Sequence, residues 1–380
     1  MISTTNSSKY KLFSITNFIF FLLIVPKINL LDISNYHQGI RIENLISIVI
    51  FILILLNRKN FKINDGFKFY LFCGIIFLSF LVGAVNNTPI LVITIIRIFE
   101  YIIFVIFFSN FKLDYKKIII FSKFLIIINL IVALLQYHEI LGFLSSIKYY
   151  EPDYNLWKAA GIFSGSWELS FITSILYFLI YHYDKKKINI YLFSTLIILY
   201  LASTRGVMIP FFISIIFLYL GKIRFNLYSL VILSLFIYGF YFFVLKYFGI
   251  DFLFLIESLI RLIFLNQNIF SDFSTVEDQY YSWAYRLTDW TMHANTFNLN
   301  ILTNLFGTGY TSIYYESFIL RILFANGIIG LAIICIFALK MRLYTVIFLL
   351  TTGFSLDFVV SFKMFIVLFI YFKYSKILEK

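Results

Sequence analysis

Hydrophobic residues run along this chain in long blocks that are separated by short polar connectors. A helix needs roughly 20 apolar residues to cross the hydrocarbon core of a bilayer, and fewer where interfacial side chains help. The pattern therefore predicts an all-α polytopic membrane protein. We expect about twelve transmembrane helices, the last two of them short, over residues 12–31, 42–57, 67–85, 89–109, 118–138, 163–182, 189–204, 206–221, 226–246, 316–339, 343–357 and 361–373.

One long polar stretch interrupts this pattern, over residues 247–315. We expect it to form a large loop within a single integral membrane domain that comprises residues 1–380. Its most apolar part, residues 252–265, is too short to span a bilayer. That part also carries Glu257 and Arg261 four residues apart, on one face of a helix. We interpret it as a helix that lies in the plane of the membrane surface.

The basic residues predict which side of the membrane each connector faces, because short cytoplasmic loops carry an excess of Lys and Arg. One side of the predicted bundle receives most of these cations, which are Lys9, Lys11, Arg58, Lys59, Lys62, Lys112, Lys116, Lys117, Lys185, Lys186, Lys187, Lys222, Arg224, Lys340 and Arg342. The short connectors on the other side hold only scattered cations such as Arg41, Lys148, Lys158 and Arg205. We therefore expect both termini in the cytoplasm and the large loop outside.

Composition excludes a soluble domain, because 61% of the residues are hydrophobic and only 13% are charged. A formal net charge of +12 would also fit a nucleic-acid partner. The cations cluster beside the predicted spans, however, where they fit contact with the anionic headgroups of a lipid bilayer. We expect the bilayer and no nucleic acid as a partner. Cys73 and Cys335 both fall inside hydrophobic blocks, and two such thiols neither crosslink a fold nor form a metal site.

Two arginines stand out because a charged residue within a span costs roughly 2.5–3.5 kcal/mol at the helix centre. Arg97 lies in the middle of a block, with Glu100 three residues later on the same helix face. The two form either a neutralised structural pair or part of a polar cavity. Arg205 lies in a very short outer connector. It either snorkels to the membrane surface or grips a phosphate group.

Residues 277–297 of the loop have the pattern of an amphipathic helix, with an apolar stripe that includes Trp290. The opposite face carries Ser282, Arg286, Asp289 and His293. A solvated face is the ordinary explanation of such a row. Asp289 can also orient Arg286 so that its planar guanidinium group faces an anion. His293 has no second His or Cys near it in the sequence, so we predict no metal site there.

Glu316 opens a predicted span directly after the loop. An acidic residue at a helix N-terminus can simply interact favourably with the helix dipole. A carboxylate at the boundary between water and lipid can also accept a proton from a hydroxyl group. Arg321 lies five residues later and faces a different side of the helix, so it is not a direct helix partner of Glu316.

Four patches between about residues 160 and 340 resemble the O-antigen polymerase and O-antigen ligase superfamily. They are Ala160-Gly-Ile-Phe163 with Trp167-Glu168, Leu201-Ala-Ser-Thr-Arg205, Arg286 and Trp290 followed by Asn304-Leu-Phe-Gly-Thr-Gly309, and Glu316-Ser-Phe-Ile-Leu320 with Gly327-Ile-Ile-Gly-Leu331. The resemblance implies the fold of the C-type membrane glycosyltransferases, a helical bundle with one large extracytoplasmic loop. These enzymes use glycans linked to undecaprenyl diphosphate at the outer face of the bacterial cytoplasmic (inner) membrane.

Ligases of the superfamily carry His-Asn where this chain has Glu316-Ser317, so the resemblance favours a polymerase of O-antigen, capsule or exopolysaccharide repeat units. It implies a metal-independent transfer without a cofactor. Arg205 and Arg286 are expected to stabilise the departing lipid diphosphate, and Glu316 to activate the acceptor hydroxyl. The other expected substrate contacts are Arg97, Asp289, His293, Gly307, Gly309, Tyr310 and Arg321. A chain-length regulator and a flippase of the same pathway are expected partners.

Three alternatives stay open at this point. The first is a ligase that attaches finished polymer to a lipid A core. The second is a mannosyltransferase-like enzyme with a catalytic acid after its first span, where this chain has Asp32 without supporting motifs. The third, from another class, is a flippase of lipid-linked oligosaccharides or another transporter. Many transporters carry repeated halves and helices that are broken in the middle of the membrane. The sequence shows no internal repeat and no linker rich in Pro or Gly, which argues against a transporter.

Overall fold

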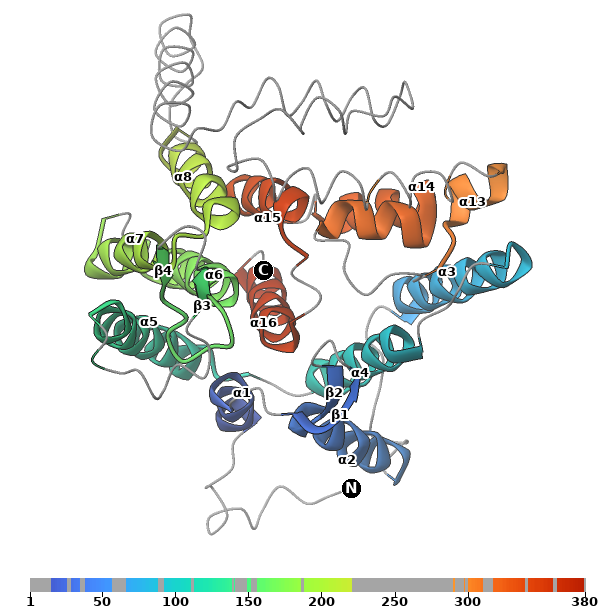
Figure 1. Cartoon of the computed structure of the whole chain (residues 1–380), viewed down its shortest axis with the longest axis horizontal. Coiled ribbons are helices and arrows are strands. Elements are labelled where there is room, and N and C mark those ends of the chain that lie inside the picture. The colour runs from blue at the N-terminus through green and yellow to red at the C-terminus, as the bar shows by residue number, and fades with distance from the viewer. Residues whose placement is uncertain are drawn as a thin grey trace, which may run out of the picture. The chain divides into compact units, whose positions relative to one another are not determined.

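The computed structural model describes residues 15–25, 29–34, 38–56, 66–87, 92–110, 113–138, 140, 149–151, 156–185, 188–220, 290, 297, 300–309, 317–338, 341–357 and 361–378. This part of the chain is predominantly α-helical, as predicted (Figure 1). It also contains two short antiparallel β-hairpins that the sequence pattern did not predict. The chain divides into two compact units. Unit 1 comprises residues 1–71, 92–214 and 338–380, and unit 2 comprises residues 72–91 and 215–337.

Unit 1 contains most of the described helices. They are α1 (Ile15–Ile24), α2 (Ile42–Leu56), α4 (Val92–Ser109), α5 (Tyr115–Tyr137), α6 (Ser166–Asp184), α7 (Ile190–Ala202), most of α8 (Arg205–Leu220), α15 (Leu343–Ser355) and α16 (Phe362–Leu378). The hairpins pair β1 (Asn29–Ser34) with β2 (Gln38–Arg41), and β3 (Tyr149–Glu151) with β4 (Leu156–Lys158). Helices α5, α7 and α16 pack against α6, which is buried from Glu168 to Ile180 (Figure 1).

Helix α5 carries buried polar residues at intervals of seven, namely Ser122, Asn129 and Gln136. Seven residues are close to two turns, so the three side chains lie along one helix face. Ser122 Oγ and Asn129 Nδ2 each donate a hydrogen bond to the carbonyl four residues earlier, at 2.8 Å. The side-chain oxygen of Asn129 and the whole amide of Gln136 therefore remain for partners outside α5.

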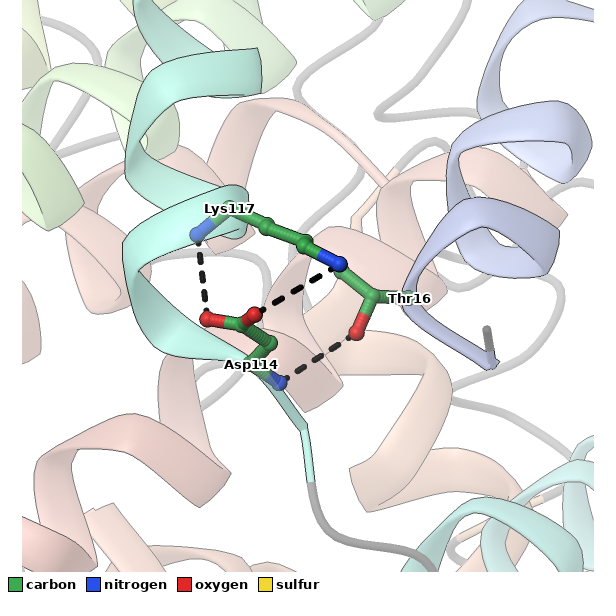
Figure 2. A network of polar contacts seen from close by, with 3 residues as sticks. All are labelled: Thr16, Asp114 and Lys117. Atoms are coloured by element: carbon green, nitrogen blue, oxygen red, sulfur yellow. Dashed lines mark hydrogen bonds and ion pairs between the residues drawn. The ribbon is translucent and has the colours of Figure 1, made fainter. Parts of the chain in front are cut away.

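Asp114 fixes the start of α5 and joins it to α1 (Figure 2). Its carboxylate accepts a hydrogen bond from the Lys117 backbone N–H at 3.3 Å, which caps the helix. Its own N–H donates to Thr16 Oγ1 at 3.2 Å. The Lys117 ammonium lies 3.8 Å from the same carboxylate, but both side chains are about half exposed. Such an exposed ion pair adds little stability, so the backbone contacts define this corner.

Two described helices are long and apolar enough to cross a membrane, Tyr115–Tyr137 and Phe318–Ile336. Shorter apolar helices cover Ile42–Leu56, Cys73–Val85, Ile190–Ala202, Arg205–Tyr219 and Leu343–Ser355. Large hydrophobic side chains are exposed along these helices, for example Ile48, Val49 and Ile52 on α2. Extended apolar faces of this kind fit a lipid environment.

Most described residues of the predicted spans are helical, but several helix ends differ from the prediction. The prediction over residues 12–31 is wrong beyond Ile24, because α1 ends there and β1 begins at Asn29. Pro26 disfavours a longer helix because it has no N–H to donate. The helix predicted over residues 226–246 and the in-plane helix over residues 252–265 lie outside the described residues.

Unit 2 contains the larger part of α3 (Gly66–Val85), together with α13 (Ile301–Phe306) and most of α14 (Phe318–Ala338). Helix α13 begins with a reciprocal cap. The Asn300 side chain accepts from the Thr303 N–H at 2.9 Å, and Thr303 Oγ1 accepts from the Asn300 N–H at 3.1 Å. Asn300 Nδ2 also donates to Asn86 Oδ1 at 2.9 Å, so the cap ties α13 to the end of α3.

Candidate functional site

Arg205 is the first residue of α8, and its side chain is exposed. The turn that precedes it is short and well bonded. Ser203 has a left-handed backbone with φ of 49°, and its N–H donates to the Leu199 carbonyl at 3.1 Å. Thr204 Oγ1 donates to the Ala202 carbonyl at 3.2 Å. Because α7 holds the turn in this way, the Arg205 side chain starts from a fixed backbone position.

Helix α15 anchors the head of α8 from a second direction. Ser355 Oγ, on the last residue of α15, donates a hydrogen bond to the Gly206 carbonyl at 2.9 Å. A Cβ atom on Gly206 would collide with this hydroxyl group. The two helices therefore approach each other closely at this point, next to Arg205.

A loop over residues 159–165 lies between β4 and α6, and Gln136 of α5 holds it. Gln136 Oε1 accepts hydrogen bonds from the N–H groups of Ala160 and Gly161, at 3.1 and 2.8 Å. Gln136 Nε2 donates to the Gly161 carbonyl at 2.9 Å. One buried side chain thus satisfies three backbone groups of a loop that is itself buried, which such groups require.

Gly161 allows the close approach of α5 to this 159–165 loop. Its φ is +62°, and a Cβ atom there would collide with Asn129 Oδ1 and with the Leu169 side chain. Asn129 Oδ1 accepts a hydrogen bond from the Ile162 N–H at 3.1 Å. The loop therefore requires glycine at this position for conformation and for space.

Glu168 holds the other end of the 159–165 loop. It is buried in the first turn of α6, and its Oε2 atom accepts hydrogen bonds from the Ser164 N–H at 2.9 Å and from Ser164 Oγ at 2.6 Å. Its Oε1 atom accepts a hydrogen bond from Ser361 Oγ, directly before α16. One carboxylate thus joins the loop, α6 and the start of α16.

Lys363 is the second residue of α16 and is only 2% exposed. Its ammonium group lies 5.2 Å from the centre of the Phe163 ring. The charges of Glu168 and of Glu43 on α2 both act on it, and Nζ has no hydrogen-bond partner among the described residues. We name Glu43, Glu168 and Lys363 the Lys363 cluster. Buried charges of this kind inside apolar helices are expensive and require compensation.

Glu100 is a second buried carboxylate in unit 1, on α4. It accepts hydrogen bonds from Asn44 Nδ2 and from Ser47 Oγ of α2, the latter at 3.5 Å. The charge of Arg97 also acts on it, although the two do not form a direct ion pair in the described part of the chain. Glu100 therefore has uncharged partners on α2, in addition to the expected influence of Arg97.

In unit 2, the segment Gly307-Thr308-Gly309 runs along α14 as a short extended turn. The Thr308 N–H donates to the Phe324 carbonyl at 2.9 Å, and the Gly309 N–H donates to the Ala325 carbonyl at 3.1 Å. Gly307 and Gly309 both have a positive φ, of 77° and 74°. The two glycines that the sequence singled out thus shape a backbone contact with α14.

Helix α14 is broken at Gly327, where φ is 69° and ψ is −173°. This backbone conformation is essentially restricted to glycine. Beside the break, the Phe324 and Ala325 carbonyls accept hydrogen bonds from the Thr308 and Gly309 N–H groups. In a bilayer such irregular backbone is tolerated where protein covers it. Helix α14 therefore has a break of the kind that many transporters contain.

Arg321 is buried in the first half of α14, with 5% of its surface exposed. Ser317 caps this half, because its Oγ atom accepts a hydrogen bond from the Leu320 N–H at 3.3 Å. The Ser317 carbonyl accepts from the Arg321 N–H at 3.0 Å. A buried arginine in an apolar helix is a candidate functional residue by its cost alone.

The remaining predicted site residues lie outside the described residues. They are Glu316, Arg286, Asp289, His293 and Tyr310. Trp290, which the loop pattern placed on the apolar stripe, is buried. Among the described candidates, Arg97 and Arg205 belong to unit 1, whereas Gly307, Gly309 and Arg321 belong to unit 2.

Sequence reasoning missed Gln136 and Lys363, although both left a signal. Gln136 completes a polar repeat of seven residues in an otherwise apolar helix, which indicates a specific partner on that face. Lys363 places a cation near the start of the last predicted span, a position that the charge pattern of the connectors does not explain. Polar positions inside apolar blocks therefore indicate functional or structural partners as polar loops do.

No protein-family model matches this sequence, and no curated protein or solved structure matches it. The described residues alone define the class: a predominantly helical protein in which two helices are long and apolar enough to cross a membrane.

Proposed function

We propose that this chain is a membrane glycosyltransferase of the O-antigen polymerase type. It joins oligosaccharide repeat units linked to undecaprenyl diphosphate into a surface polysaccharide, at the outer face of a bacterial cytoplasmic membrane. The observation that carries the proposal is the position of Arg205. This cation is exposed at the head of α8, on a turn that α7 and α15 both hold. The order of the four sequence patches supplies the type of reaction.

The head of α8 favours an anionic ligand. The N-terminus of a helix carries partial positive charge, so a cation there is disfavoured by about 0.3–1 kcal/mol. A bound anion reverses this effect, because the helix dipole and the guanidinium group then attract the same ligand. A lipid diphosphate is such an anion, and the planar fork of arginine binds phosphate oxygens in pairs.

The proposed reaction is a direct displacement. A hydroxyl oxygen of the acceptor sugar bonds to the anomeric carbon of the donor glycan, and the bond from that carbon to the diphosphate oxygen breaks. The diphosphate leaves with the bonding electron pair, and Arg205 and Arg286 stabilise its charge. The hydroxyl proton passes to the Glu316 carboxylate. A general base of this kind contributes about 10²–10⁴-fold to the rate.

Polar groups inside the apolar helices fit contacts to the glycan and its carrier. The half-buried Arg97 and the buried Arg321 are the described members of this set. The Gly307–Gly309 turn brings backbone near α3 and α14 in unit 2, and a side chain on either glycine would oppose this. Tyr310, Asp289 and His293 complete the proposed contacts. A chain-length regulator and a flippase are the proposed protein partners.

The test is a gel of surface polysaccharide from a strain that lacks the gene and is complemented with defined variants. Wild type is expected to restore long polymer, whereas Glu316→Gln and Arg205→Lys are expected to leave single repeat units. Arg342→Lys, at the predicted cytoplasmic side, is the matched control and should restore polymer. If Arg205→Lys gives polymer of normal length, Arg205 only snorkels to the membrane surface. If Glu316→Gln gives polymer of normal length, another group accepts the proton.

A flippase of lipid-linked oligosaccharides is the second candidate, because the broken helix α14 is a feature that transporters use at their binding sites. The same gel separates the candidates. Loss of all outward-facing repeat units in the deletion strain favours the flippase. Long polymer that stays on its lipid carrier favours the ligase.

A further inference from the structure

Gln136 bonds to a loop and not to a neighbouring helix, although α5 packs on α6 and α7. All three of its hydrogen bonds go to backbone groups of Ala160 and Gly161. The loss of this amide therefore removes three hydrogen bonds that hold the 159–165 loop, while the bonds that Ile162 and Ser164 donate to Asn129 and Glu168 remain.

One backbone hydrogen bond connects the 159–165 loop to the end of α7, which leads into the turn of Ser203 and Thr204 before Arg205 (the Arg205 turn). The Ala159 N–H donates to the Leu201 carbonyl at 3.0 Å, at the C-terminal end of α7. Leu201 is four residues before Arg205 and two residues before Ser203, where the turn begins. Ala159 in turn precedes Ala160, whose N–H Gln136 holds. A short covalent and hydrogen-bonded path thus runs from Gln136 to the head of α8.

The carbonyls near the C-terminus of α7 require donors, because the last turn of a helix lacks them within the helix. Ala159 supplies one, and the Ser203 N–H contacts the Leu199 and Tyr200 carbonyls. If the loop moves away, the Leu201 carbonyl loses a donor and the turn loses one of its supports.

We propose that Gln136 is a positioning residue for Arg205. It fixes the 159–165 loop against the end of α7, and the loop keeps the Arg205 turn in the orientation that grips the lipid diphosphate. This inference rests on the proposed function of Arg205 as the group that binds the diphosphate. Gln136 itself does not touch the substrate in this proposal.

The first test measures the loop directly and does not depend on activity. Nitroxide labels are attached at Lys158→Cys and Tyr200→Cys in a background with Cys73→Ala and Cys335→Ala. Lys158 precedes Ala159, and Tyr200 is 69% exposed beside Leu201, so the two labels report on this contact. With Gln136 present, the two labels are expected to show strong dipolar broadening of their electron paramagnetic resonance spectrum. Gln136→Met is expected to weaken this broadening.

Gln136→Met keeps the size of the side chain and removes its hydrogen bonds. Ser122→Ala is the matched control, because Ser122 lies on the same face of α5 but bonds only to its own helix. Gln136→Glu keeps an oxygen that can accept from the two N–H groups, and it is expected to recover a large part of the broadening. A role that is merely structural would instead show as lost protein in the membrane, which quantitative blotting measures.

The second test follows polymer yield per amount of protein. Gln136→Met is expected to lower it at least tenfold, whereas Ser122→Ala leaves it unchanged. Arg205→Ala combined with Gln136→Met is expected to show no further loss beyond Arg205→Ala alone, because both changes remove one function. An additive loss, normal polymer yield from Gln136→Met, or unchanged broadening in that variant each overturns the positioning role.

Failure of the proposed function gives a different result. Polymer that is independent of the gene, or that survives Arg205→Ala, removes the function of Arg205 and the positioning role with it. The label measurement still shows in that case whether Gln136 holds the loop. Failure of the inference alone appears as loss of polymer with Arg205→Ala but not with Gln136→Met.

Discussion

Gly307 and Gly327 each lie where a side chain would collide with the backbone beside the other. A Cβ atom on Gly307 would meet the Ala325 carbonyl group, and one on Gly327 would meet the Leu305 carbonyl group. Both glycines also have a positive φ. The end of α13 and the break in α14 therefore fit together backbone to backbone, and two glycines far apart in the sequence make one structural feature.

Gly307→Ala and Gly327→Ala are each expected to destabilise the protein strongly. Overpacking costs about 1–3 kcal/mol, and a non-glycine residue in a sparsely populated backbone region costs about 1–3 kcal/mol more. The effect is measured by heating the protein in detergent and following the loss of its monodisperse peak in size-exclusion chromatography. Gly74→Ala is the control, because a Cβ atom there meets nothing within 4 Å. Equal melting of all three variants contradicts the prediction.

The Lys363 cluster predicts a non-additive pair of substitutions. Lys363→Met removes the cation on which the charges of Glu168 and Glu43 both act. Removal of one partner from a buried ionic group costs about 3–5 kcal/mol. Addition of Glu168→Gln is expected to recover part of this loss, because it removes one of the uncompensated charges.

Thermal stability of the two single variants and of the double variant gives the coupling free energy between Lys363 and Glu168. Lys116→Met, which removes an exposed lysine at the start of α5, is the control and should change stability by about 0.5 kcal/mol or less. A double variant that is as unstable as the sum of the single ones shows that the two side chains act independently.

The hydrophobic pattern predicted the helices well because each helix extends over an uninterrupted run of apolar residues. Helix α2 begins at Ile42 and α15 at Leu343, where the pattern placed them. It failed where a contact distant in sequence decides the backbone. Helix α6 begins at Ser166 and not at Phe163, because Gln136 and Asn129 hold the preceding residues in a loop.

The break in α14 shows the same limit from another side. Gly327 lies in an apolar block without proline, so the sequence favours a continuous helix. The backbone of α13 and the Thr308 and Gly309 N–H groups stabilise the break instead. Hairpin β1–β2 was hidden because its first strand, Asn29–Ser34, overlaps the end of an apolar block. The periodicity of hydrophobic residues indicates which positions are buried. It does not indicate which distant backbone groups form hydrogen bonds with them.

One buried hydrogen bond between helices of unit 2 provides a smaller test. Asn326 Nδ2, at the break in α14, donates to Ser79 Oγ of α3 at 3.2 Å, and both side chains are buried. Such bonds between membrane helices are worth about 0.6 kcal/mol on average and 1.7 kcal/mol at most. Ser79→Ala should lower stability within this range.

Ser122→Ala serves as the reference for that loss. Ser122 Oγ bonds only to a carbonyl of its own helix, whereas Ser79 Oγ makes the equivalent bond to Ile75 and also accepts the bond from Asn326. The difference between the two alanine variants in thermal stability isolates the bond between helices. A larger loss from Ser122→Ala than from Ser79→Ala contradicts the prediction.

The predicted topology is tested most sharply across α6. This helix has 19 residues, which at 1.5 Å per residue span about 28 Å, close to the hydrocarbon thickness of a bilayer. Ile140 and Ile188 lie beyond its opposite ends and are equally exposed, at 66% each. The lysines beside Ile188 predict that this end is cytoplasmic.

In a background without Cys73 and Cys335, a membrane-impermeant maleimide should label Ile140→Cys in intact spheroplasts and Ile188→Cys only after lysis. Labelling of both cysteines before lysis excludes α6 as a membrane span. The reverse pattern means that the protein has the opposite orientation, with Arg205 in the cytoplasm, where the proposed transfer cannot occur.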